Sequence, residues 1–339
     1  MKNIITKFGL VLIGSTVLLP QVSYAWGASG HRMVSTAGIK SLPDNLPSFL
    51  RTDNSAAIIG ELGREPDRSK GSGKSHDRDL DPGHYLNLGD DGLIANSVAI
   101  TALPDSRENY DTALRAKGSD EYQAGFLPYS IIDGWQQLRK DFAYWRADKA
   151  GIKYAKSIPE RQWFEHDQQL HEILILRDTG YWSHFVADAS QPLHVTTHFN
   201  GWGEYDNPGN FLNAKSVHAD FEGSYVSKYI QLATVMNNMP QPKVLGCEIE
   251  QQTANYLIAT NKQVVPFYQL INSHPLSLES REVSQFAISR LAAGAAELRD
   301  LIMAAWQCSL DMTVGFPPVS VEDIESGHTN PIHEMGGLD

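Results

Sequence analysis

Basic residues are scarce in this sequence, and they form no run. The 339 residues carry 28 lysines and arginines against 40 aspartates and glutamates, which gives a formal net charge of −12. Without a basic track, a protein must grip a phosphate group by something other than lysine and arginine side chains. Bound metal cations are the obvious substitute.

A second long apolar segment is also missing. The one apolar run, residues 8–19, follows two lysines and precedes Ser23-Tyr24-Ala25, with small residues at the two positions that a signal peptidase inspects. This pattern predicts a secretory signal peptide over residues 1–25, because the run is too short for a membrane anchor. We therefore expect a soluble mature chain that begins at Trp26 and resides in a periplasm or outside the cell.

Alternating patterns typical of β-strands are nearly absent. Apolar residues recur instead at helical spacing, with Gly- and Pro-rich loops between the helical segments. The expected helices cover residues 129–145, 161–176, 181–188, 218–232, 249–271 and 281–307. The predicted fold is a single all-α domain with long loops over residues 26–315. Residues 316–339 lack periodicity and are expected to form a loose tail.

Cysteine is limited to Cys247 and Cys308. In an oxidising compartment the two can pair, which stabilises the fold by about 4 kcal/mol in the chain-entropy model. Two buried free thiols are the alternative. We favour the disulfide, because export exposes both residues to oxidant.

Histidine, by contrast, recurs beside acidic residues. The segment SHFVADASQPLHV places His184 and Asp188 four positions apart on a helical pattern, so that both side chains face the same direction. Gln191-Pro192 then ends the helix and places His194 a short distance beyond. One helix face is thereby predicted to hold a cation.

The segment VHADFEG repeats this arrangement with His218 and Glu222, again four positions apart. Imidazole and carboxylate groups are ligands that zinc takes. A single such pair is more typical of a hydrogen bond on a helix surface. The combination of two pairs with a flanking histidine predicts a site for several metal ions.

The stretch WGASGH adds two candidate ligands at the predicted mature N-terminus. Signal cleavage would give Trp26 a free amine, and this amine and the Trp26 carbonyl can chelate a cation in a five-membered ring. The imidazole of His31 would add a third donor. The alternative is that Trp26 only packs and that His31 caps a helix.

These motifs together resemble the trinuclear-zinc superfamily of single-strand-specific nucleases and bacterial zinc phospholipases C. The matching residues are WGASGH, the H-x3-D-x5-H pattern that ends at His194, and the later His-x3-acid pair, which together extend from Trp26 to Glu222. The resemblance implies a helical fold of that type and three zinc ions.

The resemblance also implies two further ligands, Asp67 in EPDRSK and His84 in DPGHYLNL. It distributes the ligands over three ions. One ion would be held by Asp67, His84, His184 and Asp188; the second by His194, His218 and Glu222; the third by Trp26 and His31, with Asp188 bridging it to the first.

Roles near the substrate follow from the same resemblance. Asp67 would orient the attacking water while serving as a ligand. Lys70 would stabilise charge in the transition state, with a solvated loop lysine as an equal alternative. Tyr85 is placed to stack on a nucleobase, and Asn87 stands where the nucleases commonly have an aspartate that contacts the base.

The function expected on these grounds is phosphate-ester hydrolysis by a zinc-activated water. The first hypothesis is a single-strand-preferring endonuclease or 3′-nucleotidase, with nucleic acid or nucleotides as substrate, because WGASGH and the Asp67-x2-Lys70 spacing are nuclease-like. The alternative is a phospholipase C acting on phosphatidylcholine-like lipids, because Glu222 replaces the aspartate usual in the nucleases. A purely structural zinc protein is a third hypothesis. No stable protein partner is implied, and we expect a monomer.

Overall fold

Helices dominate the computed structural model, which describes residues 26–69 and 75–336. The predicted signal peptide and Lys70 lie outside the described residues. Strands in the described part are confined to two small antiparallel hairpins, β1 (Leu93–Ile94) with β2 (Val98–Ala99) and β3 (Thr313–Val314) with β4 (Val319–Ser320). The all-α prediction is confirmed. None of the described helices combines the length and the apolar character that crossing a bilayer requires.

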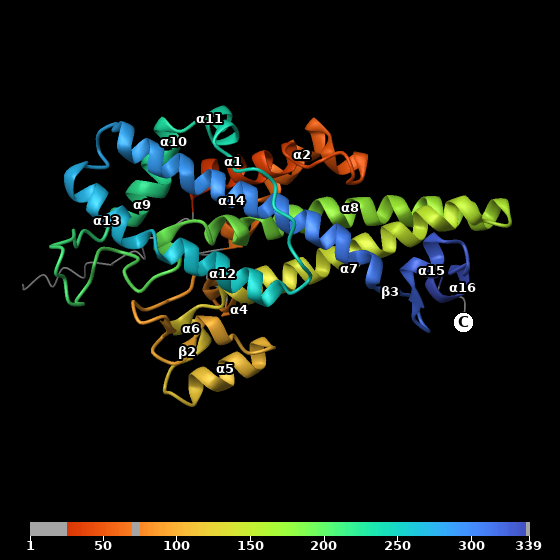
Figure 1. Ribbon diagram of the computed structural model, residues 1–339, viewed down its shortest axis with the longest axis horizontal. Helices are drawn as coiled ribbons and strands as arrows, with labels where there is room; N and C mark the ends of the chain where they lie inside the picture. Colours follow the sequence, from red (N-terminus) through yellow and green to blue (C-terminus); the bar gives the residue numbers. More distant parts are fainter. Residues whose placement is uncertain (1–25, 70–74, 337–339) are drawn as a thin grey trace, which may run out of the picture.

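Three long helices form the frame of the molecule (Figure 1). The helices α7 (Leu127–Tyr154) and α8 (Ile158–Asp188) run side by side as an antiparallel hairpin, and α14 (Arg281–Cys308) packs across both. The two predicted segments 161–176 and 181–188 are parts of the one helix α8. This helix begins where the Ser157 side chain accepts a hydrogen bond from the backbone N–H of Glu160, a typical N-cap.

Shorter elements surround this frame. Both α1 (Gly27–Lys40) and α2 (Asp53–Leu62) pack against α8, and α1 also packs against α14. The remaining helical elements are η1 (Ser48–Arg51), α3 (Glu65–Ser69), α4 (Ser75–Leu80), η2 (Asp81–His84), η3 (Ile100–Ala102), α5 (Arg107–Arg115), α6 (Glu121–Ala124), η4 (Pro192–His194), α9 (Val217–Ala219), η5 (Asp220–Tyr225), α10 (Val226–Tyr229), α11 (Leu232–Asn237), α12 (Ile249–Asn261), α13 (Val264–Ser273), η6 (Ser309–Asp311), α15 (Val321–Glu325) and α16 (Ile332–Met335).

Two predicted helices are interrupted. The segment 218–232 is divided among α9, η5, α10 and the start of α11, and η5 is a π-helical turn that contains Gly223, a residue of low helix propensity. The segment 249–271 is divided into α12 and α13. Helical periodicity thus located these segments but not their breaks.

The apolar interior contains two large clusters. One lies among α7, α8 and α14 and includes Trp135, Trp182 and Leu298. The other lies among α1, η5, α13 and α14 and includes Trp26 and Phe221. Burial of a large apolar side chain stabilises the folded state by about 1.5–3 kcal/mol. These clusters therefore stabilise the positions of the helices that carry the histidines.

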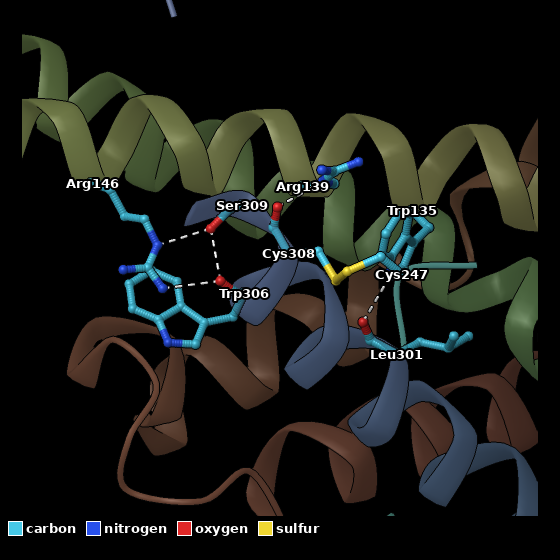
Figure 2. The surroundings of a disulfide bond; sticks show 8 residues. All are labelled: Trp135, Arg139, Arg146, Cys247, Leu301, Trp306, Cys308 and Ser309. Atoms are coloured by element: carbon cyan, nitrogen blue, oxygen red, sulfur yellow. Dashed lines mark hydrogen bonds between the residues drawn. A yellow bond between two sulfur atoms is a disulfide. The ribbon is translucent and has the colours of Figure 1, made fainter. Parts of the chain in front are cut away.

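The predicted disulfide between Cys247 and Cys308 is present (Figure 2). It ties the segment before α12 to the last residue of α14 across a sequence separation of 61. Beside it, the guanidinium Nε of Arg139 donates to the Cys308 carbonyl at 2.8 Å, and the indole N–H of Trp135 donates to the Leu301 carbonyl at 3.0 Å. The end of α14 is therefore fixed to α7 by polar contacts as well as by the sulfur bridge.

The expectation of a loose tail is wrong for residues 316–336. They complete the β3–β4 hairpin and form α15 and α16, which lie near the free end of the α7–α8 hairpin (Figure 1). Val321 and Ile324 are buried and pack in a cluster with Ala147 and Ala150 of α7. The segment is ordered because these few apolar residues, although too sparse to give a periodic pattern, are covered by α7.

Candidate metal centre

Four elements bring five candidate ligands to one place. His31 comes from α1, Asp67 from α3, His84 from the last position of η2, and His184 and Asp188 from the last turn of α8. All five residues are at most 8% exposed. The four-residue spacing on α8 supplies one pair, and the packing of α1, α3 and η2 around the end of α8 supplies the other three residues.

The donor atoms of these residues converge. Nε2 of His184 lies 2.9 Å from Nδ1 of His84, 3.4 Å from Oδ2 of Asp188 and 3.7 Å from Oδ1 of Asp67. Nε2 of His31 lies 3.5 Å from Oδ1 of Asp188 and 4.0 Å from Oδ2 of Asp67. One oxygen of Asp188 thus faces His31 and the other faces His84 and His184, which is the orientation that a bridging carboxylate needs.

A backbone carbonyl orients His184. The Nδ1 atom of its ring lies 2.8 Å from the Gly63 carbonyl oxygen, so Nδ1–H is the donor and the proton is assigned to that nitrogen. The lone pair of Nε2 then faces Asp67 and His84. Hydrogen bonds of this kind fix the tautomer and the ring orientation of metal-binding histidines.

A second group of donors comprises His194, His218 and Glu222. It lies near the first group, because the His194 ring contacts the His84 carbonyl. Oε2 of Glu222 is 2.8 Å from Nε2 of His218 and 3.6 Å from Nε2 of His194. Burial acts to raise the pKa of Glu222, but the two histidines outweigh it, and the pKa falls to about 2. The carboxylate is therefore ionised, in the form that binds cations.

Unsatisfied ring nitrogens test whether this group fits a metal. Nδ1 of His194 lies 2.5 Å from the His84 carbonyl, whereas its buried Nε2 makes no hydrogen bond within the described part of the chain. Burial lowers the pKa of His194, which favours the neutral imidazole that binds metal. Two donors of a tetrahedral zinc ion lie roughly 3.4 Å apart, close to the separations found here. The residues fit zinc in both chemistry and spacing.

Trp26 stands at the N-cap of α1 with its side chain fully buried. Its indole N–H donates to the Ala187 carbonyl at 2.8 Å, next to Asp188 in the chain. Gly27, at φ +52°, lies so close to η5 that an added Cβ would stand 3.3 Å from the Glu222 carbonyl oxygen. The Trp26 side chain thus packs in the interior, as in one of the two alternatives given above. The start of α1 lies against η5, which carries Glu222. Chelation by a Trp26 amine stays a prediction.

The residues predicted to contact substrate have other partners in the described part of the chain. The Tyr85 hydroxyl donates to the Tyr122 carbonyl, and the Asn87 amide donates to the Gln123 carbonyl, each at 2.5 Å. Both side chains are thus tied to α6 by their polar ends. Their roles in substrate binding stay predictions.

A pocket of about 180 Å³ opens beside His84. Its lining includes Arg107, whose guanidinium lies 3.5 Å above the ring centroid of Phe126 and donates to both carboxylate oxygens of Glu121 at 2.7 Å. The full lining is Pro66, Ser69, Leu80, Asp81, Gly83, His84, Arg107, Phe126, Ser130, Asp133, Tyr181 and Phe185. No spacing in the sequence links Arg107 to the histidines, so sequence reasoning missed it.

Sequence reasoning also missed the role of Gln191, which it treated only as part of a helix break. The fully buried Gln191 amide donates from Nε2 to Oε2 of Glu222 at 3.1 Å and accepts from the backbone N–H of Leu193 at 2.7 Å. It links the loop that carries His194 to the carboxylate of the same donor group. Its place directly before Pro192, between two ligand motifs, was the available signal.

Comparisons with known proteins yield weak structural likeness alone. No family model matches the chain, and no curated protein matches it. The crystal structure of Clostridium perfringens alpha-toxin from avian strain SWCP is similar at 14% identity and a TM-score of 0.39, covering 86% of this chain and 69% of the toxin. Alpha toxin from Clostridium absonum is similar at 14% identity and a TM-score of 0.36, covering 84% and 67% of the two chains.

Proposed function

We propose that this chain is a zinc-dependent hydrolase of phosphodiesters. The observation that carries the proposal is that His184 belongs to two donor groups at once, one with His31 and Asp188 and one with Asp67 and His84. Sharing a ligand makes these groups one continuous centre, and Asp188, with one oxygen toward His31 and the other toward His84 and His184, is placed to bridge two cations within it. With the group at Glu222, the donors suffice for the three zinc ions predicted.

In this proposal, different residues of the protein have different roles. His31, His84, His184 and Asp188 hold cations, and the Gly63 carbonyl keeps His184 in the tautomer that does so. Bound zinc supplies a nucleophilic water near neutral pH and neutralises charge on phosphate oxygens.

Asp67 is the most exposed of the five grouped ligands at 8%, and its neighbour Pro66 lines the pocket. We assign Asp67 to orienting the attacking water. Lys70, outside the described residues, is proposed to stabilise transition-state charge.

Phosphatidylcholine-like phospholipid is the substrate that we now place first. Two observations favour it. Glu222, which stands where the nucleases usually have an aspartate, is part of a donor group. The polar ends of Tyr85 and Asn87 are hydrogen-bonded to α6 and so are not available to a nucleobase. Single-stranded nucleic acid becomes the second candidate, supported by WGASGH and by the Asp67-x2-Lys70 spacing.

The test compares both substrates on the purified protein. We expect release of a water-soluble phosphorylated headgroup from phosphatidylcholine vesicles, loss of release with a chelator, and recovery with zinc. Cleavage of single-stranded DNA with intact lipid would reverse the order of the two substrates. Turnover of neither by the zinc-loaded protein would overturn the proposal in favour of a structural zinc protein.

A pair of aspartate variants ties turnover to the centre. Asp188→Asn removes one charge from the shared ligand set and should lower turnover by at least 100-fold together with the zinc content. Asp220→Asn changes an exposed aspartate two positions before Glu222 and serves as the matched control. Equal turnover in both variants would contradict the assignment of the centre.

A further inference from the structure

A further group of metal-binding side chains lies far from the proposed catalytic centre. Asp148 is in α7, and Asp167 and His171 are on α8, four positions apart and hence on one face of the helix. His171 precedes His184 by thirteen residues on the same helix, which corresponds to about 20 Å along the axis. The group thus lies in the half of the α7–α8 hairpin that is nearer to the connection between the two helices.

The donor atoms of this group have metal-like spacing. Nδ1 of His171 lies 2.8 Å from Oδ2 of Asp148 and 3.7 Å from Oδ2 of Asp167. These distances bracket the roughly 3.4 Å that separates two donors of a tetrahedral zinc ion. The donor atoms of all three residues lie within 4.8 Å of one another.

Asp148 supplies an independent reason to expect a ligand. Its side chain is fully buried, and its Oδ1 atom makes no hydrogen bond with any residue that the structure describes. A buried carboxylate oxygen without a partner is costly, and a coordinated cation would satisfy it.

Solvent reaches the group from one side. The side chain of His171 is 12% exposed and that of Asp167 is 24% exposed, whereas Asp148 closes the inner side. The aromatic ring of Tyr144 stacks on His171 with centroids 5.2 Å apart, and the Tyr144 hydroxyl accepts a hydrogen bond from the backbone N–H of Gly315. A cation bound here would fasten α7 to α8 beneath the C-terminal hairpin.

We propose that Asp148, Asp167 and His171 form a separate zinc site with three protein ligands and a water molecule in the fourth position. Two ionised carboxylates and an imidazole that has released its proton would balance the charge of Zn²⁺. The site is separate from the centre proposed for hydrolysis, because His171 lies about 20 Å along α8 from His184. The proposal does not depend on the function proposed above.

Metal analysis of the full chain tests this proposal. The protein is equilibrated with micromolar zinc, freed of loosely held metal by gel filtration, and analysed for zinc per chain. His171→Gln and Asp167→Asn should each hold one zinc equivalent fewer than the unaltered chain, and should keep its rate on whichever phosphodiester it cleaves. His166→Gln changes an exposed histidine on the same helix outside the group and should hold the full complement.

A second measurement separates a metal site from a mere hydrogen bond. Two variants are first freed of metal and then given zinc. Zinc should raise the Tm of Asp188→Asn, in which this site is intact. It should raise the Tm of the double variant Asp188→Asn/His171→Gln by less. Equal zinc content in the unaltered chain and in both single variants would overturn the proposal. If the unaltered chain hydrolyses no phosphodiester but both single variants still hold one zinc equivalent fewer, the proposed function is wrong and this site is supported.

Discussion

His184 and His84 lie one hundred positions apart, yet the Nε2 atom of the first is 2.9 Å from the Nδ1 atom of the second. The two rings come from different elements, the end of α8 and the end of η2. Asp188 faces both of them through its Oδ2 atom, at 3.4 Å from His184 and 3.1 Å from His84. The geometry of the centre therefore depends on how these elements pack, and substitutions that disturb the supporting contacts should be felt there.

Gln191 provides the sharpest test of such support. Gln191→Leu keeps much of the side-chain volume but removes the donor to Glu222 and the acceptor for the Leu193 N–H. We expect zinc affinity to fall about 10–100-fold, the usual effect of losing a hydrogen bond to a metal ligand. Competition with a chromophoric chelator measures this change. Gln162→Leu, at an exposed position of α8, should leave the affinity unaltered, and equal affinities in all three proteins would contradict the role of Gln191.

The chain terminus provides a second test. A protein that begins at Trp26 should bind three zinc ions at the proposed catalytic centre, whereas one extra alanine before Trp26 should displace the amine and cost one of them. Zinc content and turnover should fall together. A residue added after Asp339 is the matched control. Full zinc content in the N-terminally extended protein would show that the Trp26 amine is not a ligand.

The disulfide predicts a defined loss of stability. Replacing both Cys247 and Cys308 by serine removes a crosslink across a sequence separation of 61, which corresponds to about 4 kcal/mol in the chain-entropy model. Denaturant unfolding of the two proteins measures the difference. Reductant should destabilise the unaltered chain and leave the serine variant unchanged. A loss under about 1 kcal/mol would mean that the bridge is thermodynamically unimportant.

Glu297 in α14 predicts how stability depends on pH. Burial raises its pKa from 4.5 to about 7, Asp300 adds to the rise, and Lys243 opposes it. Because the folded pKa lies above the unfolded one, the stabilising contribution is complete below about pH 4.5 and is lost as the pH rises through 7. Glu297→Gln should therefore be more stable than the unaltered chain at pH 8, by up to about 3 kcal/mol.

The measurement for Glu297 is the free energy of unfolding at several pH values between 4 and 8. Glu108→Gln, which changes an exposed glutamate, should follow the unaltered chain. If the free energy of unfolding of Glu297→Gln decreases between pH 4 and 8 as steeply as that of Glu108→Gln, the Glu297 carboxyl group is not the cause of the pH dependence.

The sequence by itself determined the features that local spacing encodes. Residues four apart on a helix share a face, so His184 with Asp188 and His218 with Glu222 could be paired without a structure, and the structure brings each pair together. Helical periodicity also predicted an all-α fold. The breaks around Gly223 and after Asn261 escaped it, because two helices in sequence differ little in periodicity from one.

The tertiary structure alone decided which distant residues meet. The sequence gives no distance between His31, Asp67 and His84, and only the resemblance suggested that they share a centre with His184. The Gly63 carbonyl, the Gln191 amide and the Asp148–His171 contact were not predicted, because each joins elements through packing. Local propensity fixes a residue's place on its own helix, but contacts between helices depend on how buried surfaces fit together, which no short segment of the chain specifies.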